Sequence, residues 1–372
     1  MQHHLARRVT AIGLTAVFAL GALAVLERTL PVQAEEIGAV NPHLDGPIPR
    51  QLSAYNLFLD PATQMPNEGV VPYDLISPLF SDYTEKHRFI WMPPGTSAQY
   101  HESEAFDFPV GTIIIKTFSF LHDIRDPSKG ERLIETRLLI RKENEWAGLP
   151  YRWNDDATEA TLALAGGRTE AVWTHYDGEE RRVNYIIPNF NQCKGCHRIG
   201  DEMQPIGPKA RHLNWDYDYA HGTENQLAYW TAVGYLEGAP APEAAPRTAQ
   251  WDDPHSGTLD ERARAYLDIN CMHCHNPKGP ANTSGLDLSF DQTDPFKVGV
   301  WKPPIAAGRG SGGFRYDIVP GKPEESILLF RMESTEPGVM MPELPRLMVH
   351  DEGVALIREW IAEMEDPRQA AR

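Results

Sequence analysis

The chain has 372 residues, enough for two or three domains, and its 52 acidic and 35 basic side chains give a formal net charge of −17. Such an acidic chain is a poor partner for nucleic acid or for an anionic lipid surface, because its own field repels phosphate. The same charge is compatible with a basic protein partner.

The first residues have the layout of a secretory signal peptide. Arg7 and Arg8 precede an uncharged apolar run at residues 9–26, and the small-residue segment 32–34 precedes two glutamates. We therefore expect residues 1–34 to be removed on export. The apolar run is just long enough to begin to span a bilayer, so an uncleaved membrane anchor is the alternative. Residues 35–51, rich in proline and polar side chains, are expected to form a linker.

Residues 52–190 have the pattern of a β-rich domain. Short runs of aromatic and β-branched residues alternate with turn residues such as Asp177-Gly178. The expected strands are residues 88–92, 112–120, 135–140, 161–165, 171–176 and 183–187. We expect an antiparallel, sandwich-like domain, with a short helix at residues 131–141 as a local alternative.

Residues 191–249 contain the first of two CxxCH motifs, Cys193-Lys194-Gly195-Cys196-His197. CxxCH is the c-type haem attachment signal. Thiols at i and i+3 lie one helical turn apart, so each reaches a different vinyl group of one porphyrin while the histidine faces the iron. A helix is expected at residues 224–236, followed by a stiff Pro/Ala linker at 238–246.

The second motif, Cys271-Met272-His273-Cys274-His275, follows an expected helix. Thr258 and Glu261 fit a capping box, and the apolar residues at 259, 263, 266 and 267 lie on one helical face. Further helices are expected from Pro323 onward and at residues 351–364. Residues 258–366 are expected to form a haem domain that folds alone.

All four cysteines belong to the two motifs, so none is left for a structural disulfide. A zinc ribbon would place about 15 to 20 residues between its CxxC pairs, far fewer than separate Cys196 from Cys271. The chain is therefore expected to carry two covalently attached haem c groups, with iron as the metal. The attachment residues are Cys193, Cys196, Cys271 and Cys274.

His197 and His275 are the expected proximal iron ligands, each with its other ring nitrogen on a backbone carbonyl. The distal ligand of the first haem has several candidates. His212 follows the motif by enough chain to reach the iron without strain, whereas Met203 barely has the reach. His221 and an iron without a distal ligand are further alternatives.

Residues 258–366 resemble class I cytochromes c, in which two terminal helices cross over the haem and a Met-Pro pair lies between them. The resemblance implies that Met341, in Met340-Met341-Pro342, is the distal ligand of the second haem. Met340 is the competing candidate, because only one of the two neighbours can face the iron.

Over its length after residue 34, the chain also resembles an uncharacterised bacterial dihaem c-type cytochrome family. The likeness rests on SPLFSDYTEKHRFIWMPPG (77–95), FDFPVGTIIIKTF (106–118), NQCKGCH (191–197), PIGPKARHLN (205–214) and INCMHCHNPKGP (269–280). It implies haem binding and electron transfer, and no particular substrate.

We therefore expect a multidomain periplasmic electron-transfer protein, with a β-rich domain followed by α-helical cytochrome c-type haem domains and a redox partner protein. The first alternative is a haem enzyme whose first iron is open toward the β-rich domain and acts on a small molecule. It is motivated by a likeness of FPVGTIIIK, followed by CxxCH, to the cytochrome P460 type. The second alternative is a haem-based sensor.

Overall fold

The computed structural model describes residues 37–344 and 346–370, and from Gly38 onward the chain forms one compact unit. The predicted signal peptide and the first two residues of the predicted linker lie outside the described residues. Within the described ranges, no helix combines the length and the apolar composition needed to cross a membrane.

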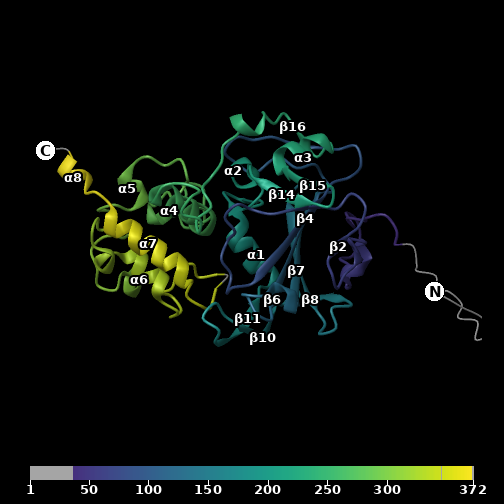
Figure 1. Ribbon diagram of the computed structural model, residues 1–372, viewed down its shortest axis with the longest axis horizontal. Helices are drawn as coiled ribbons and strands as arrows, with labels where there is room; N and C mark the ends of the chain where they lie inside the picture. The colour runs from purple at the N-terminus through teal and green to yellow at the C-terminus, as the bar shows by residue number, and fades with distance from the viewer. Residues whose placement is uncertain (1–36, 345, 371–372) are drawn as a thin grey trace, which may run out of the picture. The chain divides into compact units, whose positions relative to one another are not determined.

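A six-stranded antiparallel sheet, with strand order β3-β4-β6-β7-β8-β9, is the centre of the β-rich region (Figure 1). Its strands are β3 (Val71–Tyr73), β4 (Glu85–Trp91), β6 (Ile113–Leu121), β7 (Glu131–Arg141), β8 (Trp146–Trp153) and β9 (Ala160–Leu162). The pairing of β6 with β7 shifts register between Phe118 and Ser119. Apart from the excursion between β4 and β6, each strand pairs with its neighbour in sequence.

Both faces of this sheet are buried, which explains why β6 begins with three isoleucines. Ile113 and Ile115 pack on one face with Leu57 from the N-terminal segment. Ile114 packs on the opposite face with Trp230 of α3 (Gln226–Ala232). Because successive side chains of a strand point to opposite faces, an unbroken apolar run fits a sheet that is covered on both sides.

The prediction of an antiparallel β-rich region is confirmed, but its second layer is not the second large sheet of a sandwich. On the face of Ile114, the core includes Cys193 of α1 (Phe190–His197) and Leu213 of α2 (Ala210–Leu213) as well as α3. The segment that carries the first CxxCH motif therefore forms the covering layer.

The remaining strands form two-stranded sheets. They are β1 (Phe58–Asp60), β2 (Met65–Pro66), β5 (Ala98–Gln99), β10 (Gly167–Thr174), β11 (Glu180–Ile187), β12 (Arg198–Ile199), β13 (Glu202–Met203), β14 (Asp216–Tyr219), β15 (Gly222–Asn225) and β16 (Leu236–Glu237). β16 pairs in parallel with β5, Leu236 opposite Ala98, so backbone hydrogen bonds tie residues 191–249 to the β-rich region.

Helices dominate the C-terminal part of the chain. In addition to α1, α2 and α3, the α-helices are α4 (Leu259–Leu267), α5 (Pro295–Val298), α6 (Ile327–Glu333), α7 (Asp351–Glu363) and α8 (Pro367–Ala370). A π-helical segment, Asp268–Met272, continues α4, and short 3-10 turns occur at Leu52–Tyr55, Pro127–Lys129, Pro242–Ala244, Asn282–Ser284, Gly308–Ser311 and Pro323–Glu325.

Helices α4 and α7 pack closely against one another. The predicted capping box is present, with Thr258 and Glu261 bonding each other's backbone N–H. A side chain at Gly353 of α7 would collide with the phenol of Tyr266 of α4, so the crossing requires glycine there. Trp360 adds a hydrogen bond of 2.7 Å from its Nε1 to Asp260. The two helices therefore form one core with α6.

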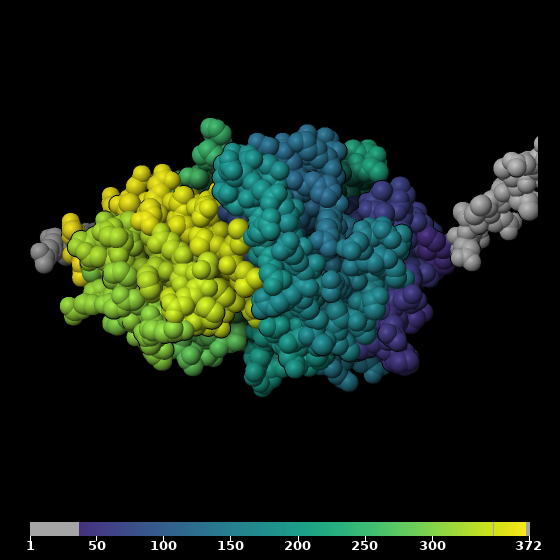
Figure 2. Space-filling view, turned by 90° about the horizontal axis from the view of Figure 1, so that it is seen from below, coloured from purple at the N-terminus to yellow at the C-terminus, as the bar shows by residue number. Residues whose placement is uncertain are grey.

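Residues 258–370 lie directly against the β-rich region (Figure 2). The Asp82 carboxylate accepts hydrogen bonds from the N–H groups of Leu347 (2.6 Å) and Met348 (2.8 Å). The N–H of Phe80 donates to the side chain of Asn270 at 2.8 Å. These contacts join the C-terminal residues to the β-rich region within one compact unit, and independent folding of residues 258–366 stays a prediction.

All six expected strands are present, with ends shifted by at most four residues. The helix considered for residues 131–141 is wrong, because those residues form β7. β8 was not predicted, since Gly148 and Pro150 interrupt its apolar pattern. The helix expected at residues 224–236 is shorter and ends at Ala232, and the one expected from Pro323 begins as a 3-10 turn before α6.

Candidate functional site

The first CxxCH motif lies in a short helix that directly follows β11. Asn189 accepts the N–H of Gln192, whose side chain in turn accepts the N–H of Asn189, and this capping box starts α1. Cys193 and Cys196 are therefore one helical turn apart, as the motif requires.

His197 has one ring nitrogen fixed by the backbone. Its Nδ1 lies 2.8 Å from the carbonyl oxygen of Gln204, which can only accept, so Nδ1 carries the proton and Nε2 presents its lone pair. Burial, with smaller contributions from the charges of Lys116 and Arg137, lowers the pKa of His197 to about 4. The imidazole is neutral at physiological pH, which is the form that binds a metal.

A cavity of about 550 Å³ lies next to this motif. Its wall includes Cys196, His197, Met203, His212 and His273, together with the basic side chains of Arg141, Lys209, Arg211 and Lys278. The volume falls within the range of about 300–1,000 Å³ that is usual for cofactor and ligand sites. The volume and the positions of Cys196 and His197 therefore fit a porphyrin at the first motif, although Cys193 is not part of the cavity wall.

Cys193 and Met203 pack together against β8. A methyl group at Gly148 would approach the Met203 Cε to 2.9 Å and the Cys193 Cβ to 3.1 Å, so this strand position has no room for a side chain. Gly148 thus allows α1 to lie close to the sheet.

The second motif follows the π-helical segment Asp268–Met272. The Cys271 carbonyl accepts the N–H groups of Cys274 at 3.1 Å and His275 at 2.9 Å, so the motif is a helical turn. His275 pairs through Nδ1 with the Ser284 hydroxyl at 3.0 Å. The predicted carbonyl partner is thus confirmed for His197 and wrong for His275. Burial also lowers the pKa of His275 to about 4.

The four cysteines are not paired with one another. Burial raises the pKa of Cys271 and of Cys274 to about 12 and raises those of the other two thiols, so all four are protonated at neutral pH. In the part of the chain that the structure describes, no group of three or more His, Cys, Asp or Glu side chains is arranged to hold a metal ion.

Met341 and Cys271 line one small cavity of about 20 Å³, although they are far apart in sequence. That space holds about one water, so its volume does not accommodate a porphyrin, and the haem expected at the second motif rests on the CxxCH motif alone. Arg346 is 3% exposed and organises the loop: its guanidinium donates to the carbonyls of Met341 and Met348 and to three carbonyls at the end of α6. Met340, by contrast, is buried in the core.

The candidates for the distal side of the first site occupy different places. Met203 and His212 both line the large cavity. His221 lies in the β14–β15 turn, where its half-exposed side chain pairs with Glu224 at 3.1 Å. His221 is outside the wall of the cavity.

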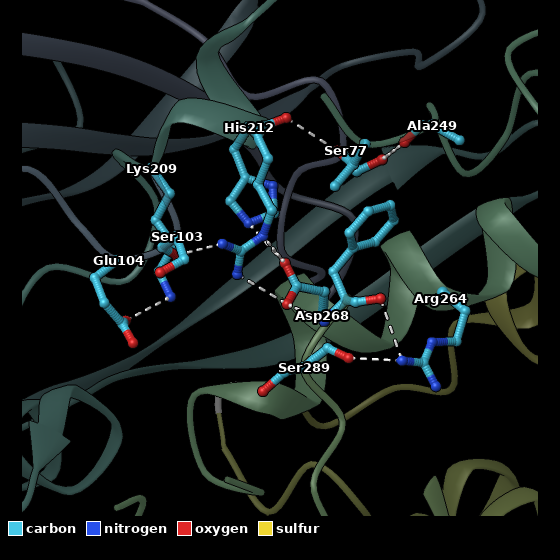
Figure 3. Close-up of polar contacts among 12 residues, drawn as sticks. Ser77, Ser103, Glu104, Lys209, His212, Ala249, Arg264, Asp268 and Ser289 are labelled. Atoms are coloured by element: carbon cyan, nitrogen blue, oxygen red, sulfur yellow. Dashed lines mark hydrogen bonds and ion pairs between the residues drawn. The ribbon is translucent and has the colours of Figure 1, made fainter. Parts of the chain in front are cut away.

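Asp268 is the centre of a buried polar network that joins the segments of the two motifs (Figure 3). Its carboxylate accepts two bonds from Arg211 (2.9 and 3.0 Å), one from Nε2 of His212 (3.0 Å) and one from the N–H of Phe290 (3.1 Å). Although burial alone would raise the pKa of Asp268, the hydrogen bond from His212 and the charge of Arg211 hold it well below its ordinary value.

Two residues at the site were missed by sequence reasoning. His273 lies inside the second motif yet lines the cavity beside the first, and burial lowers its pKa to about 3. Asp268 precedes the second motif, and nothing in the local sequence distinguishes it from an ordinary surface carboxylate at the end of a helix. Only the adjacency of the two motif segments in space shows what either residue contacts.

No protein-family model, no curated protein and no solved structure matches this chain.

Proposed function

We propose that this protein is an exported, periplasmic dihaem c-type cytochrome that transfers electrons to a redox partner protein. The observation that carries the proposal is the first motif. Its helical turn separates the thiols correctly, its histidine presents a neutral Nε2, and it opens on a cavity of cofactor size. Haem c supplies one-electron redox chemistry at a covalently held iron.

At the first site, Cys193 and Cys196 would hold the porphyrin and His197 would bind the iron. The Gln204 carbonyl fixes the tautomer and the orientation of the His197 ring. Cationic side chains around the cavity, Arg141 and Lys278 among them, would pair with the carboxylates of the cofactor.

At the second site, Cys271 and Cys274 would hold the porphyrin, with His275 on one side of the iron and Met341 on the other. The class I cytochrome c arrangement of residues 258–366 belongs to this proposal. Its support is the packing of α4 against α7 and the loop that Arg346 holds with Met341 beside Cys271. A thioether opposite histidine favours ferrous iron and raises the potential.

The proposal is tested on protein exported by a host that matures c-type cytochromes. Stepwise redox titration of the haem absorbance should resolve two one-electron transitions, and neither ferrous haem should bind CO. The enzyme and sensor alternatives both need an iron with an open position. CO binding at one ferrous haem would therefore favour them over the electron carrier.

A further inference from the structure

We propose that His273, the residue between the two cysteines of the second motif, is the distal iron ligand at the first haem. The inference rests on the proposed function, since it requires a haem at the first motif. It means that one helical turn holds the second haem through Cys271, Cys274 and His275 and also reaches the iron of the first.

The backbone of the second motif makes this double role possible. His273 has helical dihedral angles (φ −58°, ψ −24°), and the His275 N–H bonds the Cys271 carbonyl four residues earlier. Successive side chains on an α-helix are about 100° apart, so His273 and His275 point to nearly opposite sides of the turn. The side of His273 is the cavity of the first motif, where its ring shares the wall with His197 and Cys196.

The two motif segments also touch through the backbone. The N–H of Gly200, three residues after His197, donates to the carbonyl of Lys278 at 2.9 Å, three residues after His275. The His273 side chain is 5% exposed, and its Nδ1 has no hydrogen-bond partner among the described residues. That nitrogen is adjacent to the ring carbon that carries Cβ, as is the unpaired Nδ1 of His212, so it is the place of the ring in the cavity wall beside His197 that favours His273.

The rival ligands are each held by other contacts. His212 gives its Nε2 to Asp268, so only Nδ1 is left for a metal. Nδ1 is adjacent to the ring carbon that carries the side chain, and a flat porphyrin approaching it would meet Cβ and the backbone. Met203 packs its methyl group toward Gly148 beside Cys193, on the side where the porphyrin is attached.

This ligation would link the two sites by a short covalent path. Cys274, bonded to the second porphyrin, is the next residue after His273, so the path from one cofactor to the other iron crosses a single peptide unit. The His273 turn would then fix both the spacing of the two haems and their electronic coupling.

The test uses full-length exported protein and begins with the wild type. Intact mass should show two covalent haems, and near-infrared magnetic circular dichroism of the ferric protein should show one bis-histidine and one histidine–methionine haem. In His273→Ala, with both haems still attached, the bis-histidine band should be lost, one haem should become high-spin and bind CO, and added imidazole should restore the low-spin spectrum.

The matched control is His212→Ala, which removes the other cavity histidine and should leave both haems low-spin. His273→Met covers the case in which the alanine variant does not mature, because it should replace the bis-histidine band with a second histidine–methionine band. A wild type without a bis-histidine haem, a silent His273→Ala or His273→Met, or loss of the bis-histidine band in His212→Ala would each overturn the inference. Fewer than two haems in the wild type would instead refute the proposed function.

Discussion

Replacing Asp268 with asparagine should destabilise the protein by about 3–5 kcal/mol, the usual cost of breaking one side of a buried ion pair. The Asp268 side chain is fully buried, and Arg211, its bidentate partner, is 8% exposed. The Asp268 carboxylate accepts four contacts through its two oxygens, whereas asparagine has only one acceptor oxygen. Its N–H₂ group would face the N–H donors that now bond to the second carboxylate oxygen. The guanidinium would then be buried without its counter-charge.

The assay is urea unfolding followed by circular dichroism, with Asp155→Asn as the matched control. Asp155 also pairs with an arginine, but its side chain is 86% exposed, so this change should stay within about 0.5 kcal/mol. If the two variants have the same stability, the buried network does not stabilise the contact between the motif segments.

The pH dependence gives a second readout on the same variant. A carboxyl group whose pKa is lower in the folded than in the unfolded state contributes stability above its unfolded value, and that contribution is lost as the pH falls. Wild-type stability should therefore decline below about pH 4, and Asp268→Asn should show a shallower acid decline. An unchanged acid limb would contradict the assigned role.

Three further predictions concern the Met341 loop and its contact with the β-rich region. Met341→Ala should abolish the methionine-to-iron charge-transfer band and lower one potential by on the order of 100 mV in a redox titration, whereas Met340→Ala should lower stability and leave both potentials nearly unchanged. If Met340→Ala removes the band instead, the loop presents the other sulfur. Arg346→Lys should destabilise the Met341 loop by about 1–3 kcal/mol, because lysine cannot replace the bonds of the guanidinium to the loop carbonyls. In a urea titration, the methionine-to-iron band should then disappear before the helical circular dichroism signal. Loss of both signals at the same urea concentration would show that the loop does not depend on the guanidinium. Burial raises the pKa of Asp82 to about 6, so the folded state still holds a proton that the unfolded state releases near pH 4. The free energy of unfolding should therefore fall by about 3 kcal/mol as the pH rises from about 4 to about 6, and then level off. Asp82→Asn should remove that slope, and an identical slope in the variant would exclude Asp82 as its source.

Local patterns predicted the parts of the fold that depend on neighbouring residues. The capping box at Thr258, the helix that ends at Leu267 and the strand that begins with Ile113 all follow from side chains within a few positions of one another. β8 was not predicted because Gly148 interrupts its pattern. The glycine is needed for the close approach of Met203 and Cys193, which are distant in sequence, so no local pattern explains it. The packing of α1, α2 and α3 on the sheet likewise depends on contacts between residues that are distant in sequence.

The candidate site divides in the same way. CxxCH spacing predicts the attachment residues and the proximal histidines, since that chemistry is confined to one helical turn. The positions of His273 and Asp268 depend on which segments meet in space: His273 lines the same cavity as His197, and Asp268 accepts hydrogen bonds from Arg211 of the first motif's segment. The spacing of residues along a chain cannot show such a pairing.

The central claim, that the chain carries two covalent haems, is tested most directly by intact mass under denaturing conditions on the exported protein. We predict a single species with the mass of the processed polypeptide plus two haems, falling to one haem in a Cys193→Ala/Cys196→Ala variant and to one in a Cys271→Ala/Cys274→Ala variant. A wild-type polypeptide that carries one haem, or none, in a host that matures other c-type cytochromes would contradict the account.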